Sequence, residues 1–297
     1  MNITNETTPM RIDVDAVLRQ RLGTKYRRIP RFVIRALEKI VCQDKLNRLL
    51  KENAQFQGAD FCHGVLSSLG ITVSVSHPER LPKAPDSDMR CIFACNHPLG
   101  GLDGMALIDY FTSISPTGRV WFVVNDLLMA VTPLRCVFLP VNKHGRQSRE
   151  AALRIEEAFS GPDPILVFPA GLVSRKQKGG IFDLAWNKMF IQKAIQYRRD
   201  IIPLHFSGRN SSFFYNFALA RKRLGIKFNI EMILLPREIF NNTGARFIVT
   251  PGDRIPWQEL VGGSDAAKTA SSIRQKVYQL AEDEPTTDHP SRSHSPA

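Results

Sequence analysis

A histidine and an aspartate at the end of an apolar run are the residues of this chain best suited to chemistry. Residues 95–104 read Cys-Asn-His-Pro-Leu-Gly-Gly-Leu-Asp-Gly, so a glycine-containing turn separates His97 from Asp103. Such a turn lets the Asp103 carboxylate fold back onto one ring nitrogen of His97, which leaves the other nitrogen to accept a proton from a substrate hydroxyl. The carboxylate would fix the tautomer and stabilise the imidazolium, as in Ser-His-Asp triads. The spacing fits equally well a structural pair, in which Asp103 caps a helix and His97 occupies a turn.

A second polar segment follows another apolar run. Residues 167–180 read Val-Phe-Pro-Ala-Gly-Leu-Val-Ser-Arg-Lys-Gln-Lys-Gly-Gly, so the turn beyond Gly171 carries the Ser174 hydroxyl and three cationic side chains. Arg175 could bind a carboxylate or phosphate through its guanidinium fork, and backbone amides could add to an anion site. Taken alone, the same composition also describes a basic surface loop.

A third polar cluster ends the run that begins at residue 201. Residues 202–211 read Ile-Pro-Leu-His-Phe-Ser-Gly-Arg-Asn-Ser, which makes Arg209 and Asn210 candidate substrate ligands. The pattern favours a packed strand residue for His205 over a second catalytic base.

These segments need strands that end near one another. Short apolar runs occupy residues 71–75, 91–95, 120–124, 137–141, 165–168, 201–206 and 247–250, and helix-length segments such as 103–111, 148–159 and 186–197 separate several of them. Strands alternating with helices predict an α/β fold with a largely parallel, twisted sheet flanked by helices. Ligands of such sheets bind at the carboxyl ends of the strands.

The N-terminal third is helical and basic. Apolar residues recur at helical period between Ile29 and Val41, with Arg28, Arg31, Arg35 and Lys39 on the other side. Residues 17–39 hold eight basic side chains and one acidic one. A basic amphipathic helix can lie in the headgroup region of an anionic membrane, or it can pack on the body with its charges in solvent. We therefore divide the chain into a helical, basic amphipathic segment (1–70), an α/β domain (71–282) and a flexible tail (283–297).

The overall charge indicates a polyanionic partner. Forty Lys and Arg against 28 Asp and Glu give a net charge of +12, which attracts nucleic acid, anionic lipid or an acidic carrier protein. Nucleic acid is disfavoured, because the basic stretch holds few aromatics beyond Tyr26 and Phe32 and shows no nucleic-acid-binding signature. No Gly-x-Ser-x-Gly elbow of a hydrolase is present.

The expected compartment follows from two features that the sequence does not show, an apolar leader and a membrane-spanning run. Residues 1–10 have no apolar leader, and the apolar window 120–141 is interrupted by Asp126 and Arg135, so we expect neither a signal peptide nor a membrane-spanning helix. The five cysteines show no metal-ligand spacing and indicate reduced thiols. A cytoplasmic protein without a bound metal is expected.

Taken in order, the three strand ends resemble the glycerolipid acyltransferase family typified by lysophosphatidic acid acyltransferases. His97 and Asp103 are similar to its His-x4-Asp block, residues 168–175 to its Phe-Pro-Glu-Gly-Thr-Arg-Ser block, and residues 202–204 to its Val-Pro-Ile block. Residues 135–141 stand where a Phe-Ile-Asp-Arg type of run is expected. The likeness covers about residues 85–215.

Two departures narrow the resemblance. Five residues instead of four separate His97 from Asp103, and Ala170 stands in place of the customary Glu. The extra residue is familiar in the hemolysin-like branch, which includes O-acyltransferases of ornithine and glycine lipids. Asn47, residues 58–61 and residues 208–211 also look like that branch.

The resemblance implies an enzyme that moves a fatty acyl group from an acyl carrier protein or coenzyme A thioester to the hydroxyl of a lyso-lipid, with no bound cofactor. His97 and Asp103 would be catalytic, and the substrate would contact Gly171, Ser174, Arg175, Lys188, Arg209 and Asn210. The missing Glu favours a hydroxyacylated amino acid as acceptor. Synthesis of phosphatidic acid and a non-enzymatic, basic membrane-binding role remain the alternatives. Either way, the inner face of the plasma membrane is the expected location.

Overall fold

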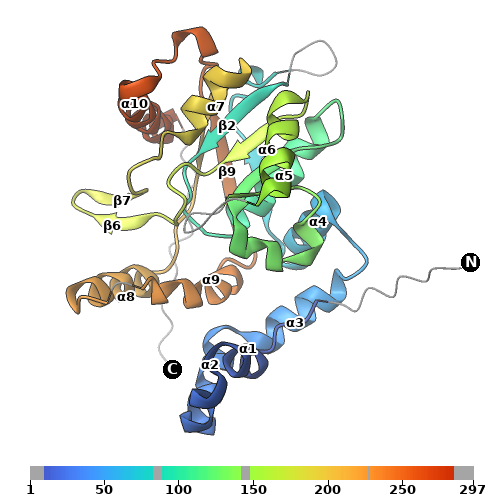
Figure 1. Ribbon diagram of the computed structural model, residues 1–297, viewed down its shortest axis with the longest axis vertical. Coiled ribbons are helices and arrows are strands. Elements are labelled where there is room, and N and C mark those ends of the chain that lie inside the picture. Colours follow the sequence, from blue (N-terminus) through green and yellow to red (C-terminus); the bar gives the residue numbers. More distant parts are fainter. Residues whose placement is uncertain (1–9, 83–88, 142–147, 227, 284–297) are drawn as a thin grey trace, which may run out of the picture.

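The computed structural model describes residues 10–82, 89–141, 148–226 and 228–283. A seven-stranded sheet with the order β1-β9-β8-β2-β5-β3-β4 forms its centre (Figure 1). The strands are β1 (Thr72–Val75), β2 (Cys91–Cys95), β3 (Trp121–Asn125), β4 (Phe138–Val141), β5 (Ile165–Val167), β8 (Asp200–Phe206) and β9 (Arg246–Pro251). Every neighbouring pair in this sheet is parallel except β8 and β9. The predicted α/β fold with a largely parallel sheet is confirmed.

Helices cover both faces of the sheet. Side chains alternate along β2, so Cys91, Phe93 and Cys95 enter one core cluster while Ile92 and Ala94 enter the other. The first cluster is covered by α4 (Gly58–Ser68) and α5 (Leu102–Ile114), and the second by α6 (Arg149–Ser160), α7 (Met189–Tyr197) and α10 (Ala266–Gln279). Burial on both faces explains why the central strands read as continuous apolar runs.

The strand order brings the three predicted segments together. β2 lies between β8 and β5 and is parallel to both, so the carboxyl ends of all three strands meet at one edge. His97 follows the middle strand of the three. The segment that follows β5 is therefore on one side of His97 and the segment that follows β8 is on the other.

Two features at this edge were not predicted. The basic loop contains a short antiparallel hairpin, β6 (Arg175–Gln177) and β7 (Gly180–Phe182). Beyond β8 the chain forms α8 (Ser212–Arg223), a 3-10 turn η5 (Ile230–Leu234) and α9 (Leu235–Asn241). A third core cluster holds these elements together through Val173, Phe214, Tyr215 and Leu234, with Ile40 of the N-terminal region packed against it.

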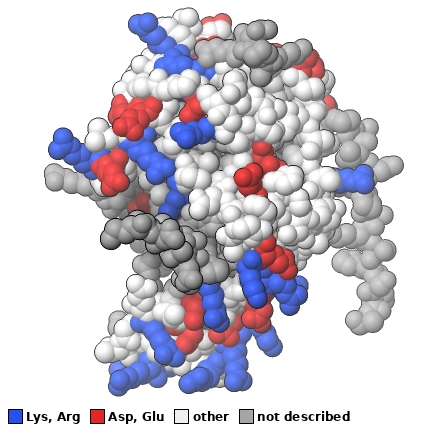
Figure 2. All heavy atoms as spheres, turned by 90° about the vertical axis from the view of Figure 1, so that its right-hand side faces the viewer, with Lys and Arg blue, Asp and Glu red and all other residues white. Residues whose placement is uncertain are grey.

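The N-terminal helices are α1 (Val14–Leu22), α2 (Arg31–Ile40) and α3 (Gln43–Glu52). Figure 2 shows Lys and Arg side chains gathered at the lower end of the molecule, where Figure 1 places these helices. The helical period places Phe32 on the predicted apolar face and leaves Ile34 off it, but Ile34 is buried and Phe32 is 73% exposed. Only part of its apolar face therefore meets the rest of the protein.

The predicted boundary at residue 70 lies between elements that pack together. Phe61 and Val65 of α4 share a core cluster with β2, so the boundary between 1–70 and 71–282 does not separate two packed units. Of the predicted tail 283–297, only Asp283 lies within the described residues. No helix in the described part of the chain is long and apolar enough to cross a bilayer.

Candidate active site

The Asp103 carboxylate lies against the His97 ring. Its Oδ2 is 2.9 Å from His97 Nδ1 and also accepts hydrogen bonds from the N–H groups of Leu99 (2.9 Å) and Gly100 (3.3 Å). Its Oδ1 accepts from the Gly104 N–H at 2.9 Å. The fold-back that the spacing predicts is therefore present. Asp103 does not cap α5, because the residue at the cap position is Gly101.

The electrostatics of the turn keep Asp103 ionised. Burial is the largest influence and acts to raise the pKa of Asp103, whose side chain is fully buried. The neighbouring His97 and the N–H groups of Leu99 and Gly104 act in the opposite direction and leave this pKa below its ordinary value. The carboxylate is thus held as a permanent acceptor for the Nδ1–H of His97.

The His97 ring is fixed on a second side by an aromatic stack. The Phe168 ring lies 4.0 Å from it, centroid to centroid, at an interplanar angle of 19°. With the proton on Nδ1 directed at Asp103, Nε2 is the basic nitrogen of the ring. Nε2 forms no hydrogen bond with any described residue, and the side chain remains 14% exposed. The ring is therefore held in one orientation, with Nε2 unoccupied by any described residue.

A buried carboxylate that the sequence reasoning missed holds the backbone of this turn. Asp183 Oδ1 accepts hydrogen bonds from the His97 N–H (3.2 Å) and from Ser174 Oγ (2.6 Å), and its Oδ2 accepts from Trp186 Nε1 (2.9 Å). The Ser174 N–H donates in turn to the His97 carbonyl at 2.8 Å. One signal was available, because Asp183 stands between Phe182 and Leu184 in an otherwise apolar run.

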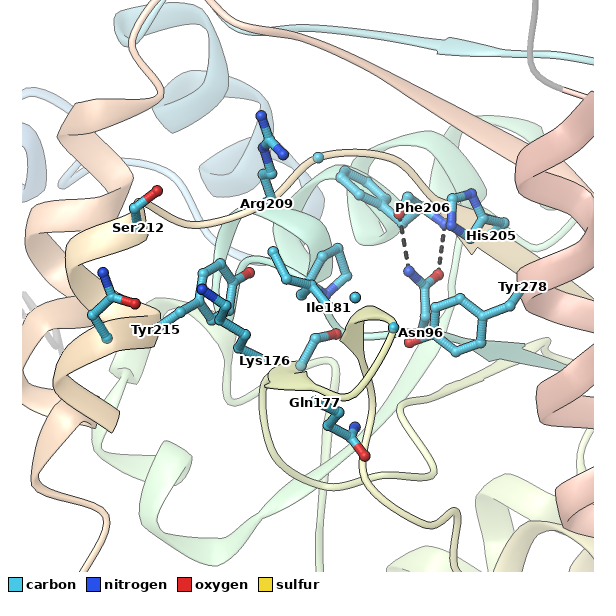
Figure 3. Close-up of a pocket in the computed structure, with 16 residues that line it drawn as sticks. Asn96, Lys176, Gln177, Ile181, His205, Phe206, Arg209, Ser212, Tyr215 and Tyr278 are labelled. Carbon is cyan, nitrogen blue, oxygen red and sulfur yellow. Dashed lines mark hydrogen bonds between the residues drawn. The ribbon is translucent and has the colours of Figure 1, made fainter. Parts of the chain in front are cut away.

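A pocket of about 680 Å³ opens beside the turn (Figure 3). His97 does not line it, but the flanking residues Asn96 and Pro98 do. Asn96 joins β2 to β8 by donating from Nδ2 to the Phe206 carbonyl (3.0 Å) and accepting from the Phe206 N–H (2.7 Å), the two dashed lines of Figure 3. The hairpin, the segment after β8, α8 and Tyr278 complete the walls.

The walls of the pocket attract anions. Lys176 and Arg209 are exposed, line the pocket and form no ion pair with any described residue. No acidic side chain occurs among the described lining residues. Tyr215 adds a hydroxyl that stays protonated at neutral pH, since burial raises its pKa to about 12. Figure 3 shows Lys176 beside Tyr215 and Arg209 at the rim.

Arg175, predicted to bind the substrate, is instead committed to the protein interior. Its guanidinium donates to Glu231 Oε1 (2.9 Å) and to the Val173 carbonyl (2.7 Å), and it lies over the Phe214 ring. The sequence held no local signal for this ion pair, because Glu231 lies 56 residues further along the chain, and a contact between Arg175 and the substrate stays a prediction. Lys176, its neighbour on the opposite side of β6, takes the place at the pocket.

The other predicted ligands are distributed around the turn. Asn210 is buried and donates from Nδ2 to the Pro98 carbonyl at 3.1 Å, so it supports the turn from behind. Gly171 closes the turn after Phe168 at a φ of 61°, a conformation that favours glycine. Lys188 is exposed at the start of α7 and does not line the pocket. No group of side chains in the described part of the chain could hold a metal ion.

An oriented histidine base next to an anion-attracting pocket suits transfer of a group onto a substrate hydroxyl. Comparison with known proteins identifies the transferred group as an acyl group. Residues 16–285 match the family model described as "Acyltransferase". The chain belongs to this family and is an acyltransferase.

Two curated relatives are similar over nearly their whole length. The lyso-glycine lipid O-acyltransferase of Phocaeicola vulgatus is 43% identical over 269 residues, which cover 91% of this chain and 95% of that protein. The protein of the same name from Bacteroides thetaiotaomicron is 44% identical over 269 residues, 91% of this chain and 97% of that protein. The family resemblance seen in the sequence motifs is confirmed.

A distant likeness exists among solved structures. The 1-acyl-sn-glycerophosphate acyltransferase of Thermotoga maritima matches with a TM-score of 0.44 and 15% identity, over 86% of this chain and 95% of that one.

Proposed function

We propose that this enzyme transfers a fatty acyl group from an acyl thioester to the hydroxyl of a lyso-lipid whose headgroup is an amino acid, with glycine as first choice. The observation that carries the proposal is the free Nε2 of a histidine whose Nδ1 is held by a buried carboxylate. The two relatives that act on lyso-glycine lipid support the acceptor class. Ala170, in place of the Glu usual in the glycerolipid acyltransferases, also favours an acceptor other than glycerol phosphate.

In the proposed reaction His97 is a general base. Nε2 takes the proton of the acceptor hydroxyl while the oxygen attacks the carbonyl carbon of the thioester. The ester C–O bond forms, the C–S bond breaks, and the imidazolium returns the proton to the departing thiolate. Asp103 stays ionised throughout and stabilises the imidazolium, so no acyl-enzyme intermediate is required.

The pocket is the proposed site of the acceptor headgroup. An N-acylated glycine keeps a free carboxylate, which is negative at neutral pH. Lys176 and Arg209 supply positive charge, and the Tyr215 hydroxyl supplies a neutral hydrogen bond. A phosphate would meet the same charges, so lysophosphatidic acid is the competing acceptor that the assay must include.

The donor and the location belong to the same proposal. We expect an acyl carrier protein or coenzyme A thioester as donor and no bound cofactor. We assign the chain to the hemolysin-like branch, as a cytoplasmic protein held peripherally on the inner face of the plasma membrane. The cluster of basic residues between residues 17 and 39 supports this location, because such a cluster attracts anionic headgroups (Figure 2).

A reconstituted assay tests the proposal. The purified enzyme is incubated with lyso-glycine lipid or lysophosphatidic acid, and with an acyl carrier protein or coenzyme A thioester, and the products are identified by mass spectrometry. We expect doubly acylated glycine lipid, and no product from His97→Ala. Faster acylation of lysophosphatidic acid would overturn the acceptor assignment. Full activity of His97→Ala would overturn the mechanism.

A further inference from the structure

The loop between α8 and α9 exposes an unusual row of large apolar side chains. Every second residue from 224 to 230 is apolar and exposed, with Leu224 at 75% and Phe228 at 80%. We call these residues, with their neighbours 222, 223 and 233, the α8–η5 patch. Its apolar members are Leu224, Ile226, Phe228, Ile230 and Ile233. Several large exposed apolar side chains on one short segment are typical of an interaction site.

The charges of the patch have one sign. Lys222 and Arg223 are exposed in the last turn of α8. The one acid between residues 222 and 233, Glu231, is fully buried and paired with Arg175 and Arg221. The described part of the patch therefore presents apolar groups and cations, with no exposed carboxylate.

The fold holds this patch in place while leaving it outside the core. Glu231 ties η5 to the β6 hairpin through Arg175 at 2.9 Å, and Leu234 packs into the third core cluster. Met232 packs against the same cluster, whereas Ile230 and Ile233 beside it stay 42% and 39% exposed. Exposed apolar side chains on an anchored segment indicate that something else covers them.

The patch and the proposed acceptor pocket lie at opposite ends of α8. Ser212, Tyr215 and Asn216 in the first turns of α8 line that pocket. The patch begins at the other end of this 12-residue helix, a length of about 18 Å. The basic N-terminal helices are adjacent, since Ile40 at the end of α2 packs against the third core cluster, which also holds Phe214 of α8. Figure 1 shows these helices below α8 and α9.

We propose that the α8–η5 patch docks on an anionic lipid bilayer, with its apolar side chains in the boundary between headgroups and acyl chains. The five exposed apolar side chains outnumber the two exposed cations, as expected for insertion into a bilayer. Lys222 and Arg223 contact the anionic headgroups. An acidic protein partner would account for the cations but not for five exposed apolar side chains. Docking brings the mouth of the pocket towards the bilayer, and this last step rests on the proposed function.

Pelleting with sucrose-loaded vesicles tests the docking without reference to catalysis. The vesicles contain equal parts of phosphatidylcholine and phosphatidylglycerol, or phosphatidylcholine alone. We expect Leu224→Ser with Phe228→Ser to lower the partition coefficient by about tenfold or more, because two large apolar groups no longer enter the bilayer. The matched control, Leu153→Ser with Val261→Ser, removes apolar groups that are 54% and 57% exposed elsewhere and should pellet like the wild type.

Three further measurements complete the test. Thermal melting of both double variants should match the wild type, since all four side chains are exposed. Lys222→Glu with Arg223→Glu should weaken binding to the phosphatidylglycerol vesicles more than to phosphatidylcholine alone. Unchanged pelleting of the patch variant, or an equal loss in the control, would overturn the proposal. It would also be overturned if the patch variant kept its vesicle binding and lost binding to immobilised acyl carrier protein. These measurements report binding or folding and not catalysis, so their outcome does not depend on which lipid is the acceptor.

Discussion

In the described structure, cationic side chains are buried and paired on one side of the β6–β7 hairpin, and exposed and unpaired on the side that faces the pocket. On the inner side, Arg175 is buried and bound to Glu231, which Arg221 also contacts. On the pocket side, Lys176 and Arg209 are exposed and have no ion-pair partner among the described residues. A buried, paired guanidinium positions the elements that it joins. Unpaired cations around a pocket are the ones available to an anionic ligand.

His97 and Asp103 also differ in whether they have partners within the protein. The Asp103 carboxylate accepts hydrogen bonds from His97 and from three backbone N–H groups, whereas Nε2 of His97 has no partner in the described structure. Removing His97, the residue proposed to contact the substrate, should lower the activity most. We expect His97→Ala to lower kcat by about a thousandfold, within the usual range for loss of a general base.

Single-turnover assays and a melting curve on the same preparation measure this first effect. Asp103→Asn serves as the companion variant, and we expect a large loss there too, because the amide can no longer hold the ring as the required tautomer. A His97→Ala enzyme with wild-type turnover would reduce the pair to a structural element.

Asp183 should show the next largest effect, as a positioning residue. Asp183→Ala leaves the His97 N–H, Ser174 Oγ and Trp186 Nε1 without their shared acceptor. We expect kcat to fall by about a hundredfold with little change in acceptor KM, because 1 Å of misplacement is enough for such a loss. Asp183→Asn keeps one acceptor oxygen and should restore part of kcat. A change in KM alone would show that Asp183 acts on binding.

Arg175→Ala should act on stability and not on acceptor binding. Removing one partner of a buried pair leaves Glu231 with Arg221 alone, and we expect a loss of about 3 kcal/mol in the free energy of unfolding. For a protein of 297 residues that corresponds to a Tm lowered by about 5 °C. Lys178→Ala, an exposed residue of the same loop, is the control and should melt like the wild type. An unchanged Tm with a raised acceptor KM would reverse the comparison.

The case of Arg175 shows what the sequence could and could not predict. Strand ends, the fold class and the His97–Asp103 contact follow from local patterns: apolar runs, a glycine turn and a short spacing. The choice between Arg175 and Lys176 depends on which side of β6 faces Glu231, 56 residues further on. Such long-range pairing cannot be read from adjacent residues, and a shift of one position reverses the side.

The segment after β8 teaches a similar lesson. Arg209 and Asn210 were both predicted to contact substrate, but Asn210 is buried with its Nδ2 on the Pro98 carbonyl. The helices α8 and α9 beyond it were not predicted. Exposed apolar residues such as Leu224 and Phe228 resemble core residues when only composition is considered, so their position outside the core emerged only from the fold.

Lys176 and Arg209 should show a smaller effect confined to binding. Each charged contact contributes about 1.5–3 kcal/mol, so we expect either Ala variant to raise the acceptor KM by about tenfold or more. Tm and donor KM should stay unchanged, because neither side chain has an ion-pair partner in the described structure. Steady-state kinetics with each substrate varied in turn measure this. Equal increases in both KM values would place the shared effect outside the acceptor pocket.

The smallest expected effect concerns the basic N-terminal helices and separates them from the α8–η5 patch. Arg31 and Arg35 are exposed on α2, so reversing both to Glu weakens attraction to anionic headgroups without disturbing the core. We expect pelleting with phosphatidylglycerol vesicles to fall several-fold at low salt, and the difference to shrink as salt screens the charges. Binding through the patch persists in this variant, because Leu224 and Phe228 insert by apolar contact and not by charge.

Loss of all vesicle binding in the α2 variant would show that α2, and not the patch, contacts the membrane. A fully additive loss with Leu224→Ser and Phe228→Ser would instead show two contacts that bind the same bilayer independently.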